Sequence, residues 1–125
     1  MAIPSVELAA QRALTNAFVA ADAEPLTLFR SERISDGAGG QVTQPPVPVI
    51  VQLLRFQPRQ DGGSPRMTAD GEQVVPTYTL VGRHTADIER WDEFVLNGSR
   101  YQVVFVYENR QYEVKAEVAY LGAGV

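Results

Sequence analysis

The stretch DEFVLNGSRYQVVFVY, residues 92–107, decides the fold of this chain. An Asn-Gly pair at residues 97–98 separates two runs rich in apolar residues, and this pattern favours a two-residue hairpin turn. The next segment, QYEVKAEVAY at residues 111–120, alternates between apolar and polar side chains. Period-two alternation predicts a strand with one buried face and one solvated face. The side chains predicted to meet solvent are Glu113, Lys115 and Glu117.

More β-rich segments precede this hairpin. Residues 26–30 and 77–81 contain the β-branched and aromatic residues that are typical of strands. Residues 49–56, VIVQLLRF, are apolar on both faces, which predicts a strand covered on both sides. With the C-terminal strands these segments give about six strands, and short turns favour a small barrel or sandwich. The predicted fold class is mainly β, with the barrel spanning residues 25–121.

Residues 1–24 contain the one predicted helix. Apolar side chains recur there at helical spacing, Ser5 suits the N-cap position, and Pro25 prevents the helix from continuing. Only two members of the apolar face are large, Leu14 and Phe18, so we expect this face to pack on a flat surface or on a partner. The remaining members are Val6, Ala10, Ala13, Ala17 and Ala21.

Length, charge and cysteine content restrict the class of protein. The 125 residues, with a mass of 13.7 kDa, predict a single domain covering residues 1–125. A net charge of −4, with scattered basic residues, excludes a protein that coats nucleic acid non-specifically. The absence of cysteine excludes a disulfide scaffold, a thiolate metal site and a cysteine nucleophile. No apolar run approaches the roughly 20 residues of a membrane span, and we expect no signal peptide.

One long polar segment interrupts the strands. Residues 57–75, QPRQDGGSPRMTADGEQVV, show little periodicity. Loops longer than about 12–15 residues are uncommon in compact domains unless they are functional or disordered. This inter-strand loop is therefore the segment that most needs a functional explanation.

No active-site motif is present in the sequence. His84 is the only histidine, no Gly-x-Ser-x-Gly pattern occurs, and the glycine pairs at 39–40 and 62–63 lack the features of a phosphate loop. The carboxylates around Trp91 lack the spacing of a cation-binding loop and are predicted to be solvated. These carboxylates are Asp87, Glu89, Asp92 and Glu93. We therefore expect no enzyme activity, no catalytic residue, no cofactor and no metal.

The tyrosines of the C-terminal half leave two interpretations open. They suit a buried core, and they also suit a stacking platform for single-stranded nucleic acid. No basic residues cluster beside them, which favours the core. The tyrosines concerned are Tyr101, Tyr107, Tyr112 and Tyr120.

The C-terminal half also resembles a known family. Its segments are VPTYTLVG at 75–82, ADI at 86–88, WDEFVLNG at 91–98 and YQVV at 101–104, followed by an alternating strand. This order is similar to that of the head-closure, or stopper, proteins of long-tailed bacteriophages and related gene-transfer particles. The resemblance covers residues 25–121. The plainest members of that family start near the first strand, so the N-terminal helix departs from their pattern.

What the resemblance implies is a structural protein of the virion, assembled in the host cytoplasm and placed at the head–tail interface. It implies a homo-oligomeric ring, a hexamer, between the portal–adaptor complex on one side and the tail terminator and tail tube on the other. Such a ring closes the channel around packaged double-stranded DNA without sequence specificity. It also presents a docking surface for the tail.

In this family a long loop projects into the channel and obstructs it, and residues 57–75 are the matching segment. Arg59 and Arg66 would meet DNA phosphates or acidic residues of neighbouring loops, and the glycines would act as hinges. The implied channel-loop residues are Arg59, Gln60, Asp61, Gly62, Gly63, Ser64, Pro65, Arg66, Met67, Asp70 and Gly71. The residues expected to contact neighbouring subunits or partners are Leu14, Phe18, Pro45, Pro46 and Trp91.

Other functions remain open at this point. A tail terminator is a ring protein of similar size, and the long polar loop favours the head-closure protein over it. An adaptor would be mainly helical, which the β-rich pattern disfavours. A β-barrel module that binds single-stranded nucleic acid would need its tyrosines exposed beside arginines.

Overall fold

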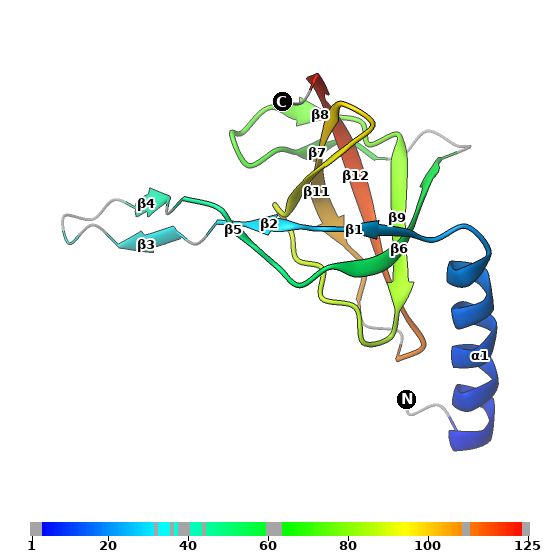
Figure 1. The fold of residues 1–125 in the computed structure, drawn as a ribbon. Coiled ribbons are helices and arrows are strands. Elements are labelled where there is room, and N and C mark those ends of the chain that lie inside the picture. Colours follow the sequence, from blue (N-terminus) through cyan, green and yellow to red (C-terminus); the bar gives the residue numbers. More distant parts are fainter. Residues whose placement is uncertain are drawn as a thin grey trace.

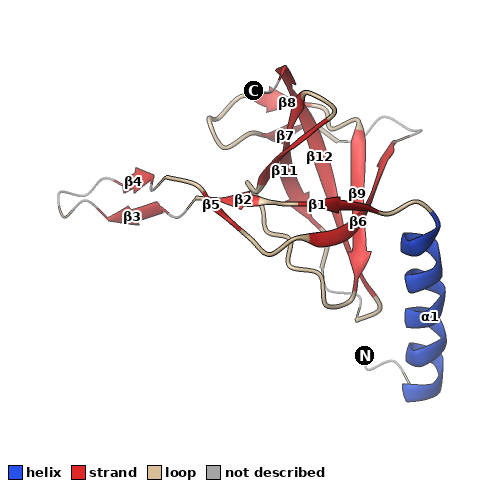
Figure 2. Cartoon of the chain, viewed as in Figure 1, coloured by secondary structure: helices blue, strands red, loops and turns tan. Residues whose placement is uncertain are grey.

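The computed structural model shows a mainly β protein with one N-terminal helix, which confirms the predicted fold class. The structure describes residues 4–31, 33–35, 37, 41–43, 45–59, 64–108 and 111–123, and for residues 33–35 and 41–43 it describes the backbone alone. The helix lies beside the strands as a separate layer (Figures 1 and 2).

Helix α1 spans Ser5–Ala21, and the described part of the chain then contains only strands. The strands are β1 (Glu24–Leu26), β2 (Phe29–Arg30), β3 (Arg33–Ser35), β4 (Gln41–Thr43), β5 (Val47–Pro48), β6 (Gln52–Pro58), β7 (Arg66–Met67), β8 (Gln73–Val74), β9 (Tyr78–Arg83), β10 (Glu93–Leu96), β11 (Ser99–Val106) and β12 (Glu113–Ala123). Two pairs, β3–β4 and β7–β8, form small separate ribbons. The β3–β4 ribbon stands away from the sheet, on the side opposite α1 (Figure 1).

The other eight strands form one curled sheet with the shape of a half-barrel, in the order β1-β6-β9-β12-β11-β10-β2-β5. The chain itself joins the two ends of this order, because β1 runs on into β2 and β5 runs on into β6. The N–H of Val49 donates to the carbonyl of Leu28 at 2.7 Å, so these two segments also pair between the β1–β6 and β2–β5 pairings. When β1 with β2 and β5 with β6 are each counted as one long bent strand, the eight strands of the sheet become six, which agrees with the number predicted from the sequence. The seam of the curled sheet lies between β10 and β2, which share the single residue pair Glu93↔Phe29.

The C-terminal hairpin is confirmed in type and position. β10 and β11 pair antiparallel, with Asn97 and Gly98 in the turn at φ 51° and 78°. Positive φ at both central residues is what a type I′ turn requires. β12 then pairs with both β11 and β9, so it occupies the middle of the sheet.

Apolar side chains fill the inside of the curled sheet. Leu54, Leu80 and Val103 are fully buried. Four aromatic rings meet in the same core, and the centroids of contacting rings are 4.8–5.6 Å apart. These rings are Phe56, Tyr78, Phe94 and Tyr101. Tyr101 is therefore a core residue, as the first of the two interpretations predicts, whereas the same prediction is wrong for Tyr120, which is 53% exposed.

The prediction that residues 49–56 are covered on both faces is wrong. The strand begins only at Gln52, and three apolar side chains of this segment are exposed. These are Ile50 at 78%, Val51 at 59% and Leu53 at 54%. The core covers the inner face of β6, whereas α1 contacts its outer face around Arg55, whose guanidinium lies 3.8 Å from the ring of Phe18.

Helix α1 forms where predicted, but with the opposite face against the sheet. It begins at Ser5 after Pro4, with no side-chain cap, so the N-cap role assigned to Ser5 is wrong. Its buried residues are Thr15 and Val19, whereas Leu14 is 72% exposed. The periodicity shows that an apolar face exists, but the side chains of β6 and β9 determine which face packs.

The polar segment 57–75 is less of a loop than the sequence predicts. β6 extends to Pro58, and the β7–β8 ribbon lies within the segment. β7 packs beside β11, so this part of the segment lies against the sheet. Residues 60–63 lie outside the described residues.

Candidate functional site

A buried carboxylate holds the base of the polar segment. Glu117 on β12 is 2% exposed, so its predicted position on a solvated face is wrong, because the polar segment covers it. Its Oε2 lies 3.1 Å from Arg59 Nη1, and its Oε1 lies 3.2 Å from Arg66 Nε. The hydroxyl of Tyr107 donates to Glu117 Oε2 at 2.5 Å. We call these four residues, Arg59, Arg66, Tyr107 and Glu117, the Glu117 clamp.

The clamp fixes the protonation states of its members. Burial raises the pKa of Glu117, but the hydrogen bonds from Arg66, Tyr107 and Arg59 outweigh burial, and the pKa lies below its ordinary value of 4.5. The hydrogen bond to Glu117, together with burial, raises the pKa of Tyr107 above its ordinary value of 10.0. At neutral pH the carboxylate is therefore ionised and the phenol is protonated, as the two arginine ion pairs and the Tyr107–Glu117 hydrogen bond require.

Both arginines of the clamp have further contacts with the sheet. The guanidinium of Arg66 lies 3.8 Å from the centroid of the Phe105 ring, a cation–π contact. The backbone N–H of Arg59 donates to the carbonyl of Thr77 at 2.8 Å. Residues 59 and 66 of the polar segment are thus both attached to the sheet.

A second anchor holds the turn between β7 and β8. Thr68 is buried, and its hydroxyl accepts from the N–H of Glu72 at 3.1 Å. The N–H of Ala69 donates to Oε1 of Gln102, a buried side chain on β11, at 2.9 Å. Gly71 completes the turn at φ 86°, a conformation that suits glycine. The ribbon is therefore tied to β11 through the Gln102 amide.

The structure divides the implied channel-loop residues into two groups. Arg59 and Arg66 come together on Glu117 of their own chain. The described remainder is exposed: Ser64, Pro65, Met67, Asp70 and Gly71. Gln60, Asp61, Gly62 and Gly63 lie outside the described residues.

A second ionic cluster closes the seam of the curled sheet. Arg30 on β2 donates from Nε and Nη2 to the two carboxylate oxygens of Asp92, at 2.9 and 2.8 Å. Asp92 is 0% exposed, and it also accepts from the N–H of Glu89 at 2.9 Å. Asp87 and Glu89 contact Arg30 at 3.0 and 2.9 Å. The prediction of a solvated loop is therefore wrong for Asp92, which is buried because Arg30 reaches it from β2.

The predicted partner contacts lie on two sides of the molecule. Leu14 and Phe18 belong to α1, and both are exposed. Pro45 and Pro46 precede β5 and are exposed as well, whereas Trp91 is half-buried. In Figure 1, α1 and β5 lie on opposite sides of the sheet. The structure thus separates these residues into two surfaces rather than bringing them together.

Trp91 has an unusual backbone conformation for a large side chain, with φ at 79°. Hydrogen bonds on both sides hold it: its N–H donates to the carbonyl of Val103 at 2.7 Å, and the N–H of Val103 donates to the carbonyl of Asp92 at 2.8 Å. The guanidinium of Arg90 lies 4.1 Å from the indole ring. The indole is therefore fixed next to the seam.

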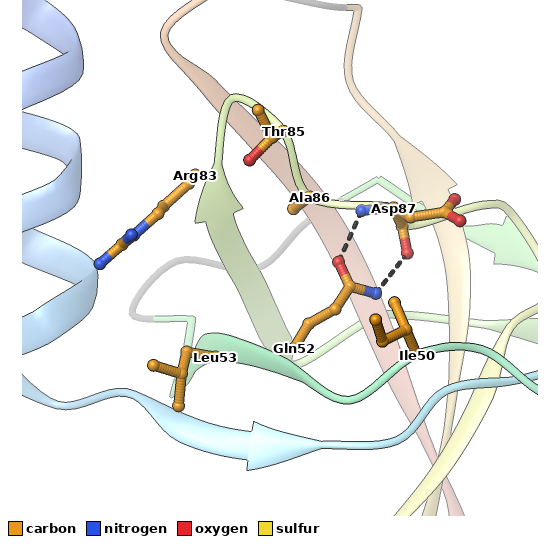
Figure 3. A pocket seen from close by; sticks show the side chains of 7 residues that line it. All are labelled: Ile50, Gln52, Leu53, Arg83, Thr85, Ala86 and Asp87. Atoms are coloured by element: carbon orange, nitrogen blue, oxygen red, sulfur yellow. Dashed lines mark hydrogen bonds between the residues drawn. The ribbon is translucent and has the colours of Figure 1, made fainter.

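Cavities lie on both sides of the sheet. One cavity of about 280 Å³ opens beside β6 and the end of β9 (Figure 3). Gln52 crosses it, and its amide bonds to the backbone N–H and carbonyl of Asp87 at 2.6 and 2.8 Å. Two further cavities, of about 400 and 260 Å³, share Glu93 and Arg100 on β10 and β11. Trp91 lines the larger of these two.

The described residues show no arrangement for metal binding: no group of three or more His, Asp or Glu side chains could hold an ion there. In the same part of the chain, no helix combines the length and apolar character needed to cross a bilayer.

Sequence reasoning missed both buried carboxylates, Glu117 and Asp92. The alternation of β12 assigns Glu117 to solvent, and no local pattern reveals that another segment covers it. Length and polarity single out segment 57–75, and the resemblance names Arg59 and Arg66 within it, but the common partner of these arginines lies more than fifty residues further along the chain. The burial of these carboxylates therefore depends on contacts between distant parts of the chain, which no local sequence pattern reveals.

Comparison with known proteins adds no relative. No protein-family model matches the chain, and no curated protein matches it.

Proposed function

We propose that this chain is a head-closure protein of a long-tailed phage or a related gene-transfer particle. In this proposal it is a structural subunit of a homo-oligomeric ring, a hexamer, between the portal–adaptor complex and the tail. The ring closes the channel over packaged double-stranded DNA and gives the tail its docking surface. The protein assembles in the host cytoplasm and acts in the virion.

The observation that carries the proposal is the Glu117 clamp. A loop that obstructs a channel must bear the force of packaged DNA at its base. In the clamp, residues 59 and 66 of the polar segment are both attached to one buried carboxylate on the central strand β12. Such an attachment gives the polar segment the firm base that a closure loop would need.

The charge of the protein is consistent with this role. The net charge is −4, and the two arginines of the segment are paired with a carboxylate of their own chain. Tight binding to DNA requires several basic groups that are available to phosphates. A channel built from such a protein would block DNA sterically and release it without a strong electrostatic attraction.

The experiment that tests the proposal deletes the gene in the parent particle and images the lysate by electron microscopy. The expected result is heads that are full or leaking, next to complete but unattached tails. Tails of abnormal length would instead assign the chain to the tail terminator. Normal infectious particles would overturn the proposal. A filter-binding series over salt concentration would then test the single-stranded nucleic-acid module.

A second variant tests the polar segment itself. Deleting residues 60–63 leaves the clamp residues in the chain, so we expect rings and attached tails but heads that lose DNA. The matched control replaces residues 60–63 with Gly-Ser-Gly-Ser, which keeps the length of the segment. Full retention of DNA by the deletion variant would contradict the role of this segment as the closure loop.

A further inference from the structure

Helix α1 turns a mostly polar side toward the sheet, with Val19 as its one buried apolar side chain, and an apolar side toward solvent. Thr15 is buried, and buried atoms of Gln11 and Asn16 find no hydrogen-bond partner among the described residues. In contrast, Val6 and Leu14 are 82% and 72% exposed. A helix that is stabilised only by its own domain normally has the opposite arrangement. The outer side of α1 therefore has the character of a docking face.

The sheet next to α1 adds an exposed apolar side chain and a cation. Alanines lie between Val6 and Leu14 on α1, and their small side chains allow close approach of another backbone. Leu53, 54% exposed, lies beside α1 on the outer face of β6. Arg83, at the end of β9, is exposed, and its side chain makes no hydrogen bond or ion pair with the side chains of the described residues; Figure 3 shows it beside α1. We define the α1 surface as Val6, Ala10, Leu14, Ala17, Leu53 and Arg83.

A complementary surface lies on the other side of the sheet. Phe29, Val47 and Val95 are 40%, 58% and 47% exposed, and two of them line the cavity of about 260 Å³. That cavity shares Glu93 and Arg100 with the one of about 400 Å³, whose lining includes Asp70 and Glu72. Neither carboxylate forms an ion pair with the described residues. We define the β10 surface as Phe29, Val47, Asp70, Glu72 and Val95.

We propose that the α1 surface of one copy of this chain docks on the β10 surface of a second copy. An apolar ridge with one unpaired cation on its edge would meet an apolar groove with two unpaired carboxylates next to it. In Figure 1, α1 lies on one side of the sheet, whereas β2 and β5, which carry part of the β10 surface, lie toward the other, so we expect the two surfaces to meet only between copies. Repetition of such a heterologous contact closes a ring when the rotation permits.

The dimensions of the surfaces fit this contact. With 17 residues, α1 is about 25 Å long. A standard interface of about 800 Å² per partner is roughly 28 Å across. The inference rests on the proposed function, because the contact between copies is taken to be the contact between neighbouring subunits of the proposed ring.

Cysteine pairing tests the contact directly, because the natural chain has no cysteine. Leu14→Cys and Val95→Cys change exposed side chains. Under mild oxidation, we expect a ladder of disulfide-linked multimers from the double variant and a disulfide-linked dimer from a mixture of the two single variants. The control pair, Leu14→Cys with Thr77→Cys, should give no ladder.

Reversing the charges of Arg83, or of Asp70 and Glu72, tests the proposed attraction between the two surfaces. Arg83→Glu should weaken self-association by about tenfold, measured by sedimentation velocity over a concentration series. The double change Asp70→Arg with Glu72→Arg should have a similar effect. Mixing these two variants should restore association, because opposite charges meet again. Thr77→Glu, which also adds a negative charge to an exposed position, should leave association unchanged.

Three outcomes would overturn the inference: no ladder from the double variant, a dimer from Leu14→Cys alone, or no rescue on mixing. A dimer from the single variant would indicate that two α1 helices meet each other. The proposed function fails separately, through normal particles after gene deletion. If the double cysteine variant gives a ladder but gene deletion leaves normal particles, the contact between copies stands and the neck function is rejected. If gene deletion leaves unattached tails but the double variant gives no ladder, the neck function stands and the contact is rejected.

Discussion

Glu117 and Asp92 are carboxylates with 2% and 0% exposure, and each is held by arginine. Taking such a pair out of water is costly, so the pair adds little stability compared with apolar side chains of similar volume. Removal of one partner is a different matter, because the charge that remains is then mostly buried without its partner: Asp92 is 0% exposed, and the Arg59 and Arg66 side chains are 14% and 27% exposed. Substitutions at these residues should therefore have larger effects than substitutions at the exposed charges.

The clearest case is Glu117→Gln. This change leaves Arg59 and Arg66 facing each other without a carboxylate, and we expect the free energy of unfolding to fall by about 3 kcal/mol. Urea denaturation measures the change. Trypsin should also cut faster after Arg59 or Arg66, because these side chains are then released from the clamp.

Glu24→Gln is the matched control, since Glu24 is exposed on β1. It should change the unfolding free energy by less than about 0.5 kcal/mol. Equal effects of the two substitutions would contradict a structural role for the clamp.

The dependence of stability on pH follows from the same clamp. The lowered pKa of Glu117 means that its contribution is present above pH 4.5 and is lost as the pH falls through the folded-state value. The raised pKa of Tyr107 means that its contribution is complete below pH 10.0 and is lost as the pH rises through the folded-state value. We expect Tyr107→Phe to remove this alkaline loss, measured as the urea midpoint between pH 8 and pH 11. An unchanged alkaline profile in the variant would exclude Tyr107 as its source.

At the scale of elements, α1 allows a direct comparison of its two faces. Val19 is 1% exposed against the sheet, so Val19→Ala should lower the free energy of unfolding by about 1–3 kcal/mol. Leu14 faces solvent, so Leu14→Ser should change it by less than about 0.5 kcal/mol. Thermal unfolding at a concentration where the protein is monomeric measures both. A larger effect at Leu14 would show that the face of Leu14, not that of Val19, packs on the sheet.

These elements also show what the sequence can predict. The hairpin at Asn97 and Gly98 could be predicted because its turn depends on the φ values of those two residues. The position of α1 was predicted from its period, but not its orientation, which depends on contacts such as Arg55 with Phe18. Burial of Glu117 could not be predicted because the alternation of β12 contains no information about the segment that covers it.

At the scale of the whole molecule, the seam between β10 and β2 is the weakest junction of the curled sheet. One residue pair joins these strands, and Arg30 adds a bidentate bond to Asp92 across the seam. Arg30→Met should leave Asp92 buried without its partner and lower the free energy of unfolding by about 3–5 kcal/mol. Hydrogen exchange should become faster first in β2 and β10, since the pairs of β11 with β12 remain.

Arg100→Met serves as the control for the seam. Arg100 also pairs with a carboxylate, Glu93, but both side chains are substantially exposed. The expected loss is below about 1 kcal/mol, with no preferential exchange at β2. Uniform acceleration of exchange in the Arg30 variant would contradict a local role at the seam.

The fluorescence of Trp91 can report on the cavity beside it. Trp91 is the only tryptophan of the chain, and its indole lies on the wall of the cavity whose lining includes Asp70 and Glu72. Its fluorescence spectrum reports the polarity around a single known position. Any occupant that displaces water from this cavity should shift the emission maximum to shorter wavelength. Each molecule therefore carries its own reporter of what docks there, without an added label.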